Sequence, residues 1–117
     1  MEGLLQLIKM LGDETRLRIM MALYEQSFCV CELVELLNES QPKISKHLAR
    51  LKDLNLVRTK RSEQFIYYEL SIESENLLAL IKTISSHLSS YETLRLDYER
   101  IMKIKERPFK CTQGELN

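Results

Sequence analysis

Two cysteines separated by one residue, Cys29 and Cys31, are the side chains in this sequence best suited to specific chemistry. The thiolate form of cysteine is a soft ligand that selects soft metal or metalloid ions over hard cations. A Cys-x-Cys pair is a weak indication when it occurs alone. Here it stands shortly before a basic, amphipathic segment at 41–54. Together the two features predict a soft-ion site attached to a surface that contacts DNA.

The third cysteine, Cys111, lies near the end of the chain. An odd number of cysteines argues against a disulfide framework, and two cysteines this close on a helix are poorly placed to bridge each other. We therefore interpret the thiols as reduced, either buried or bound to metal. The sequence has no secretory signal and no run of about 18 apolar residues, which predicts a cytoplasmic location and no membrane partner.

Basic residues are unevenly distributed in this chain, although its formal net charge is zero. The first 40 residues contain seven acidic and three basic side chains, whereas residues 41–61 have a net charge of +6. A local basic block in a neutral protein is typical of a surface that contacts phosphates. A solvated helix face is the alternative interpretation. The block consists of Lys43, Lys46, Arg50, Lys52, Arg58, Lys60 and Arg61, with Asp53 as its one acidic residue.

Short helices are predicted to position these residues. Apolar residues at helical spacing indicate helices over 2–10, 14–25, 30–38 and 41–54. Asp13 and Ser40 are suitable N-caps for the second and the fourth of these. Pro42 is tolerated in the first turn of the last one, because an amide proton there would have no partner within the helix. Two segments rich in β-branched or aromatic residues, 57–61 and 65–70, predict a hairpin.

The segment from 71 to 105 contains neither glycine nor proline and carries an apolar stripe at helical spacing. It is predicted to form one long helix or two helices joined near 89–90. Such a stripe cannot all be buried inside so small a domain, and a dimer seam is the economical explanation. Packing back on the N-terminal helices is the alternative. We expect residues 1–106 to form one domain that dimerises through its N- and C-terminal helices, and 107–117 to form an irregular tail carrying Cys111.

Two short helices joined by a tight turn and followed by a hairpin describe a winged helix-turn-helix, a mainly α-helical fold with a small β-hairpin. The second helix of such a motif fits the major groove of double-stranded DNA. A homodimer presents two of these helices roughly 34 Å apart, so we expect an inverted-repeat target. Residues near the helix start should reach base edges, and the others should contact phosphates or the flanking groove. The first group is Gln41, Lys43, Ser45 and Lys46, and the second is His47, Arg50, Arg58, Lys60 and Arg61.

Three segments carry a resemblance to a known family. Residues 11–19 (LGDETRLRI), 40–48 (SQPKISKHL) and 56–70 resemble the second helix, the recognition helix and the wing of the ArsR/SmtB metal-responsive repressors. The resemblance covers about residues 4–90 in order. It implies a dimeric winged-helix repressor that blocks transcription until an inducer binds.

The segment 29–33 (CVCEL) resembles the sensor motif on the third helix of the arsenic- and cadmium-responsive branch of that family. Trivalent arsenic or antimony prefers three sulfur ligands, whereas cadmium, lead or zinc prefers four ligands. Many arsenic sensors of this branch have a third cysteine where this chain has Val34. We therefore hypothesise a site formed by Cys29, Cys31 and Cys111. The family's second, zinc-binding site is expected to be absent, because no further histidine follows His87.

A release mechanism follows if both Cys29 and Cys31 lie on a regular helix. Their side chains would point about 200° apart. One ion could then hold both only by distorting the first turn of a helix that packs on the recognition helix. We expect this distortion to move the two recognition helices away from their spacing on DNA while the protein stays dimeric.

Three other functions are considered. A repressor of the same fold could sense oxidants or persulfides through its cysteines. A winged-helix module could bind a protein instead of DNA, although the basic block argues against it. A thiol enzyme is disfavoured because the sequence has neither a Cys-x-x-Cys motif nor a nucleophile–base pattern, and we predict that the chain is not an enzyme.

Overall fold

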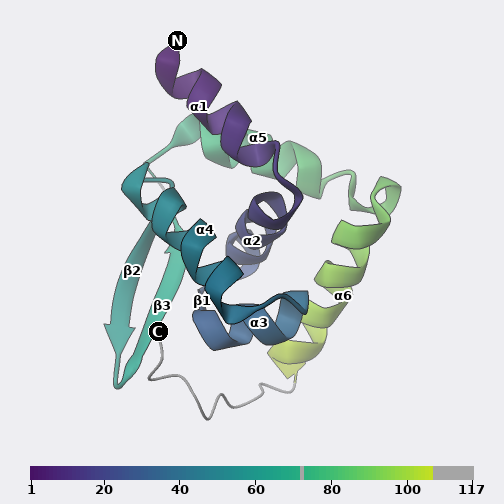
Figure 1. Ribbon diagram of the computed structural model, residues 1–117. Helices are drawn as coiled ribbons and strands as arrows, with labels where there is room; N and C mark the ends of the chain where they lie inside the picture. Colours follow the sequence, from purple (N-terminus) through teal and green to yellow (C-terminus); the bar gives the residue numbers. More distant parts are fainter. Residues whose placement is uncertain (72, 107–117) are drawn as a thin grey trace.

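The computed structural model describes residues 1–71 and 73–106, and Figure 1 shows a helical body with a β-hairpin along one edge. The tail predicted at 107–117, with Cys111, lies outside the described residues. The helices are α1 (Glu2–Leu11), α2 (Glu14–Glu25), α3 (Val30–Leu37), α4 (Gln41–Asp53), α5 (Glu75–Ser85), the 3₁₀ helix η1 (Leu88–Ser90) and α6 (Glu92–Glu106). The strands are β1 (Phe28–Cys29), β2 (Val57–Ser62) and β3 (Phe65–Leu70).

Local side-chain caps begin the helices where the sequence predicts them. The Asp13 carboxylate accepts the backbone N–H of Arg16 at 3.0 Å at the start of α2. The Ser40 hydroxyl accepts the backbone N–H of Lys43 at 3.4 Å at the start of α4. Such caps satisfy amide groups that have no partner within the helix. Asn38 ends α3 in the left-handed conformation, with φ 54°, and so turns the chain toward α4.

The sheet has three antiparallel strands in the order β1-β3-β2, one strand more than the predicted hairpin. The hairpin of β2 and β3 confirms the predicted wing. The additional strand, β1, has two residues and pairs with β3, aligning Phe28 with Tyr68 and Cys29 with Tyr67. Cys29 therefore lies in a strand, immediately before the third helix.

Helix α2 is the centre of the fold, because it contacts each of the other five α-helices and strand β3. Figure 1 shows α2 in the middle of the helical body. Its residues Ile19 and Met20 are completely buried. Fully buried side chains from the other elements complete the core around it, among them Phe28, Leu33, Ile44, Leu48, Leu51, Leu77 and Ile81.

The C-terminal segment forms two helices, which decides between the two predicted alternatives. Helix α6 folds back across α2 and α3, where it buries Leu94 and Ile101. As expected, the apolar stripe is not all buried within one chain, since Tyr91 is exposed, although Leu94 and Ile101 are buried. Packing against the N-terminal half explains α6, and dimerisation through other residues stays a prediction.

A buried ion pair holds α6 in this position. Arg18 of α2 donates from Nε to Asp97 Oδ2 at 2.8 Å and from Nη2 to Asp97 Oδ1 at 2.9 Å. The same Nη2 group donates to the backbone oxygen of Leu37, the last residue of α3, at 3.1 Å. Both charged side chains are almost completely buried. Through Arg18, α6 is bound to the end of the first helix of the helix-turn-helix.

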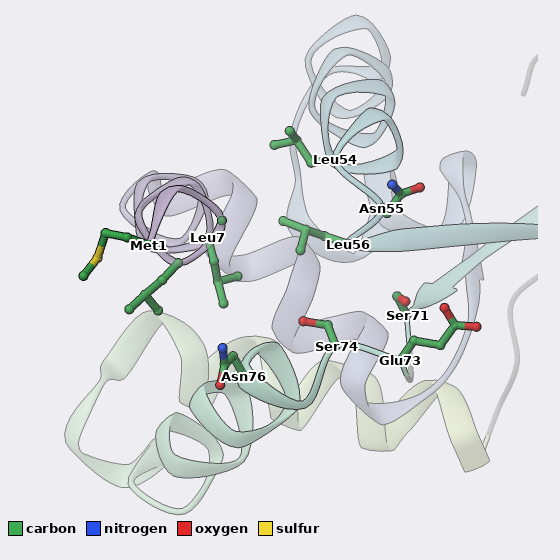
Figure 2. Close-up of a pocket in the computed structure, with 11 residues that line it drawn as sticks. Met1, Leu7, Leu54, Asn55, Leu56, Ser71, Glu73, Ser74 and Asn76 are labelled. Atoms are coloured by element: carbon green, nitrogen blue, oxygen red, sulfur yellow. The ribbon is translucent and has the colours of Figure 1, made fainter.

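A pocket of about 480 Å³ lies where α1, the end of α4 and the start of α5 meet (Figure 2). Leu7, Leu56 and Asn76 are among the side chains around it. Among the described residues that line this pocket there is no cysteine, histidine, lysine or arginine, so these residues are part of neither the predicted thiol pair nor the basic surface. Within the described ranges, no helix has the length and apolar character needed to cross a membrane.

Candidate DNA-binding surface and thiol site

Helices α3 and α4 pack on each other and form the helix-turn-helix. One face of α4 is fixed in the core by Ile44, Leu48 and Leu51, each of which is inaccessible to solvent. The opposite face is solvated and carries the basic residues that the sequence assigns to DNA. Lys43, Lys46 and Arg50 are exposed there, as predicted for a surface that reaches DNA.

Polar contacts hold the first turns of α4. The Gln41 side-chain amide donates from Nε2 to the hydroxyl of Ser45 at 2.9 Å, so these two predicted base-reading residues are joined. The Lys43 ammonium lies 3.1 Å from Glu39 Oε1, in the turn before the helix. Glu39 also lies 3.6 Å from Arg18, which places it between the buried ion pair and the recognition helix.

His47 does not share the exposed face of its basic neighbours. Its side chain is only 16% exposed, and its Nε2 lies 3.8 Å from Asp13 Oδ2, the cap of α2. Burial lowers the pKa of His47 below its ordinary value, whereas the attraction of Asp13 opposes this shift. The imidazole is thus directed toward α2, and a contact with a DNA phosphate would require it to turn outward.

The predicted cations of the wing are divided between the two faces of the hairpin. Arg58 and Lys60 share one face with Glu69 of β3, whereas Arg61 points to the other face, since side chains alternate along a strand. Arg58 Nε donates to Glu69 Oε2 at 2.6 Å, and Lys60 lies 3.6 Å from the other carboxylate oxygen. The hydrogen bond from Arg58 lowers the pKa of Glu69, so this carboxylate is ionised at neutral pH and competes with phosphates for both cations.

The two predicted thiol ligands lie at the junction of β1 and α3. Cys29 is the last residue of β1 and the N-cap of α3, and Cys31 is the second residue of that helix. Their sulfur atoms are 3.8 Å apart. Glu32 stabilises this corner by accepting the backbone N–H of Cys29 with Oε1 at 3.0 Å. Cys29 is 1% exposed, and Cys31 is partly exposed.

This geometry corrects the expected arrangement of the pair. Cys29 precedes the helix, so the separation of about 200° for two positions in a regular helix does not apply. Two sulfurs bound to one tetrahedral ion at about 2.3 Å each lie about 3.8 Å apart. The observed separation of 3.8 Å equals that value. With Cys31, which this structure records in a disulfide, in its reduced form, the spacing of the two sulfurs fits one tetrahedral ion without distortion of the first turn of α3.

The described part of the structure places no third side chain to hold a metal ion together with Cys29 and Cys31. Within 1–71 and 73–106, no group of three His, Cys, Asp or Glu side chains is placed to hold a metal ion. The predicted third ligand, Cys111, lies outside these ranges. Val34, where a local third cysteine would stand, packs against the core. His87 Nδ1 lies 3.0 Å from the backbone oxygen of Thr83, in the last turn of α5.

Sequence and structure comparisons place this geometry in a family. A protein-family model described as "Bacterial regulatory protein, arsR family" matches residues 13–59, from the cap of α2 into the wing. The chain is 37% identical to the arsenic resistance transcriptional regulator ArsR1 of Pseudomonas putida over 102 residues, which cover 86% of this chain and 78% of that protein. This chain belongs to the ArsR family. Two further arsenic-resistance regulators match over less than two thirds of their own length, 58% and 57%.

Solved structures of ArsR-like regulators have the same fold. HlyU of Vibrio cholerae superposes with a TM-score of 0.66 at 34% identity, covering 71% of this chain and 88% of HlyU. The antimony-specific transcriptional repressor AntR superposes with a TM-score of 0.64 at 26% identity, covering 76% of this chain and 79% of AntR. ArsR proteins are DNA-binding transcriptional regulators and not enzymes, as predicted here for this chain. The helix-turn-helix described above is thus its DNA-binding element.

Proposed function

We propose that this ArsR protein is a cytoplasmic, metalloid-responsive repressor that binds an inverted-repeat operator as a homodimer and leaves it when As(III) or Sb(III) binds its thiols. The observation that carries this proposal is the pair of Cys29 and Cys31 sulfurs, 3.8 Å apart at the N-terminus of the helix that supports α4. Relatives named for arsenic resistance and for antimony support the choice of ion.

An ion binds cysteine in its thiolate form, and the pair lies at the N-terminus of α3. The backbone N–H groups and dipole at a helix N-terminus stabilise negative charge on nearby side chains. Arsenic and antimony need a third sulfur, for which Cys111 is our proposed ligand. Cadmium, lead and zinc would need a fourth ligand, so they are the secondary candidates for the inducer.

The apolar surface of α1 supports the proposed homodimer. Leu4, Leu5 and Ile8 are large apolar side chains that remain exposed on this helix. An exposed apolar cluster of this kind marks a protein–protein contact. A second copy of the chain bound here, with the exposed part of α5 nearby, would fix the distance between the two α4 helices.

Release from DNA requires little energy from the thiol site. A coupling of about 1.4 kcal/mol weakens DNA binding tenfold, which lies within the usual range for allostery. The sulfurs of Cys29 and Cys31 are already close enough to share an ion. We therefore attribute the conformational change that releases DNA to the binding of the third ligand, Cys111, to the same ion. That binding shifts α3, on which α4 is packed.

The test is a fluorescence anisotropy titration of the DNA upstream of the coding sequence, with arsenite, antimonite, cadmium, lead and zinc in separate experiments. We expect arsenite and antimonite to weaken binding at least about tenfold while the protein stays dimeric. Cys29→Ser and Cys31→Ser should abolish the response and retain DNA binding, and Cys111→Ser should abolish or sharply weaken it. Full induction of Cys111→Ser would exclude this third ligand. Dissociation into monomers on arsenite binding would contradict the mechanism.

A second candidate function is the sensing of thiol oxidation. It is favoured by the short distance between the Cys29 and Cys31 sulfurs and by the similarity to HlyU, one structure of which is described as reduced HlyU. Oxidants and persulfides convert thiolates to products that no longer bind metal. Titration of the DNA complex with peroxide and polysulfide, beside arsenite, separates the two functions: the native inducer acts at the lower concentration.

A further inference from the structure

One row of side chains across the sheet connects the thiol site with the wing. Strand β1 aligns Cys29 with Tyr67 of β3, and β3 aligns Tyr67 with Lys60 of β2. Directly paired residues of antiparallel strands point to the same face with their Cβ atoms about 5 Å apart. Figure 1 shows β1 between the start of α3 and the hairpin. The row therefore leads from a proposed inducer ligand to a proposed DNA contact in two steps.

The row lies on the outer face of the sheet at Tyr67 and Lys60, and its other end, Cys29, is only 1% exposed where β1 meets α3. The opposite face carries Phe28, Val57 and Leu70, all of which are buried in the core. On the outer face, the ring of Phe65 lies 6.2 Å from that of Tyr67, as alternation along β3 requires. Because Tyr67 is only partly buried on this face, its ring is less firmly packed than Phe28, Val57 and Leu70 on the inner face.

Tyr67 is the central member of this row. Burial raises the pKa of Tyr67, and the charges of Glu32, Cys29 and Glu63 act in the same direction, while the strand register pairs Tyr67 directly with Cys29. Glu32 in turn accepts the backbone N–H of Cys29. A change in the charge and position of the Cys29 sulfur is therefore felt at the ring of Tyr67.

We propose that Tyr67 is a positioning residue through which the thiol site acts on the wing, an inference that rests on the proposed function of Cys29 and Cys31 as the inducer site. An ion bound by Cys29 pulls on strand β1, which pairs with β3. The ring of Tyr67 moves with that strand and displaces Lys60 beside it. Glu69, on the same face of β3, shifts at the same time relative to Arg58 and Lys60. The wing thus loses phosphate contacts in addition to any movement of α4.

Two neighbouring cations on β2 allow a matched test. Lys60 belongs to the row, whereas Arg61 lies on the opposite face of the sheet, and both side chains are exposed. If the inducer acts by removing the phosphate contact of Lys60, the inducer should weaken DNA binding less in Lys60→Ala, because that variant lacks this contact from the start. We expect the ratio of DNA dissociation constants with and without arsenite to fall to about a third of the wild-type ratio or less. Arg61→Ala should lower DNA affinity and keep the ratio.

Substitutions at Tyr67 test the link itself. Tyr67→Ala should reduce the arsenite ratio as Lys60→Ala does. Tyr67→Phe, which keeps the ring and folds as the wild type, should retain it, and so should Ile66→Ala on the opposite face. The link would be overturned if arsenite releases the wild type from DNA and both Lys60→Ala and Tyr67→Ala keep the wild-type ratio of DNA dissociation constants. The proposed function would then remain intact.

A measurement without DNA separates failure of the link from failure of the proposed function. Cadmium is a thiophilic probe that paired cysteines bind whether or not it is the natural inducer. Amide hydrogen exchange should show changed protection in β2 and β3 of the cadmium-loaded wild type, no change in Cys29→Ser, and a reduced change in Tyr67→Ala. If cadmium alters protection in β2 and β3 but no tested ion releases the protein from DNA, the result supports the link through Tyr67 and refutes the proposed function. Unaltered protection after cadmium has bound overturns the link.

Discussion

The buried pair of Arg18 and Asp97 allows a quantitative prediction. Asp97→Ala removes a carboxylate that receives two hydrogen bonds, at 2.8 and 2.9 Å. The arginine stays buried with the Leu37 carbonyl and Glu39 as remaining partners. Loss of one partner of a buried ion pair costs about 3–5 kcal/mol. Because two contacts remain, we expect the lower end, about 3 kcal/mol, a large share of the roughly 5–15 kcal/mol that stabilises a domain.

Urea unfolding followed by circular dichroism, at one fixed protein concentration, measures this loss as a lower midpoint with an unchanged denaturant slope. The matched control is Glu99→Ala on the same helix. Glu99 pairs with Arg95 at 2.7 Å on the surface, and its loss should cost less than about 1 kcal/mol. The double variant Arg18→Met with Asp97→Leu should recover most of the stability, since no buried charge is left alone. A loss in Asp97→Ala no larger than that in Glu99→Ala would refute the reasoning.

Three further outcomes are expected. Glu69→Gln should tighten DNA binding roughly fivefold at low salt, because Arg58 and Lys60 lose their competing carboxylate, and the gain should vanish as salt rises; an unchanged affinity in a filter-binding titration would show that these cations do not reach DNA. Since the pKa of His47 is lower in the folded protein than when unfolded, His47 costs stability as pH falls through about 6.5 toward its folded value; His47→Gln should flatten this decline in thermal unfolding between pH 7 and 5, and equal slopes would contradict the burial argument. Ile8→Lys should fold normally and sediment as a monomer with weakened operator binding, whereas a stable dimer would place the interface elsewhere.

Features determined by nearby residues could be predicted from the sequence. The caps at Asp13 and Ser40, the bounds of α2 and the hairpin depend on side chains within a few positions of one another. The buried and solvated faces of α4 follow from the spacing of its apolar residues. Local chemistry therefore predicted the helix-turn-helix and the wing, and the resemblance of three segments to known repressors indicated the family.

Features that depend on contacts between distant residues could not be predicted. Strand β1 has two residues and exists because β3 lies beside it, so no pattern in the sequence marks it. That strand brings Cys29 out of the helix and the two sulfurs to 3.8 Å. His47 lies at the border between the two faces of α4, and Asp13 decides its direction. Arg18 and Asp97 are 79 positions apart, and each alone resembles an ordinary surface charge.

The docking of α6 on Arg18 determines how short this protein can be made. A fragment that ends after η1 keeps the whole helix-turn-helix and wing, and the family match at 13–59 lies within it. It would nevertheless expose the faces of α2 and α3 that α6 covers and remove the carboxylate that binds Arg18. For fusion to another protein or for use as a DNA-binding module in a biosensor, the smallest unit thus includes Asp97. Trimming to the helix-turn-helix and the wing would require polar residues at the apolar positions of α2 and α3 that α6 now covers, Met21 and Ala22 among them.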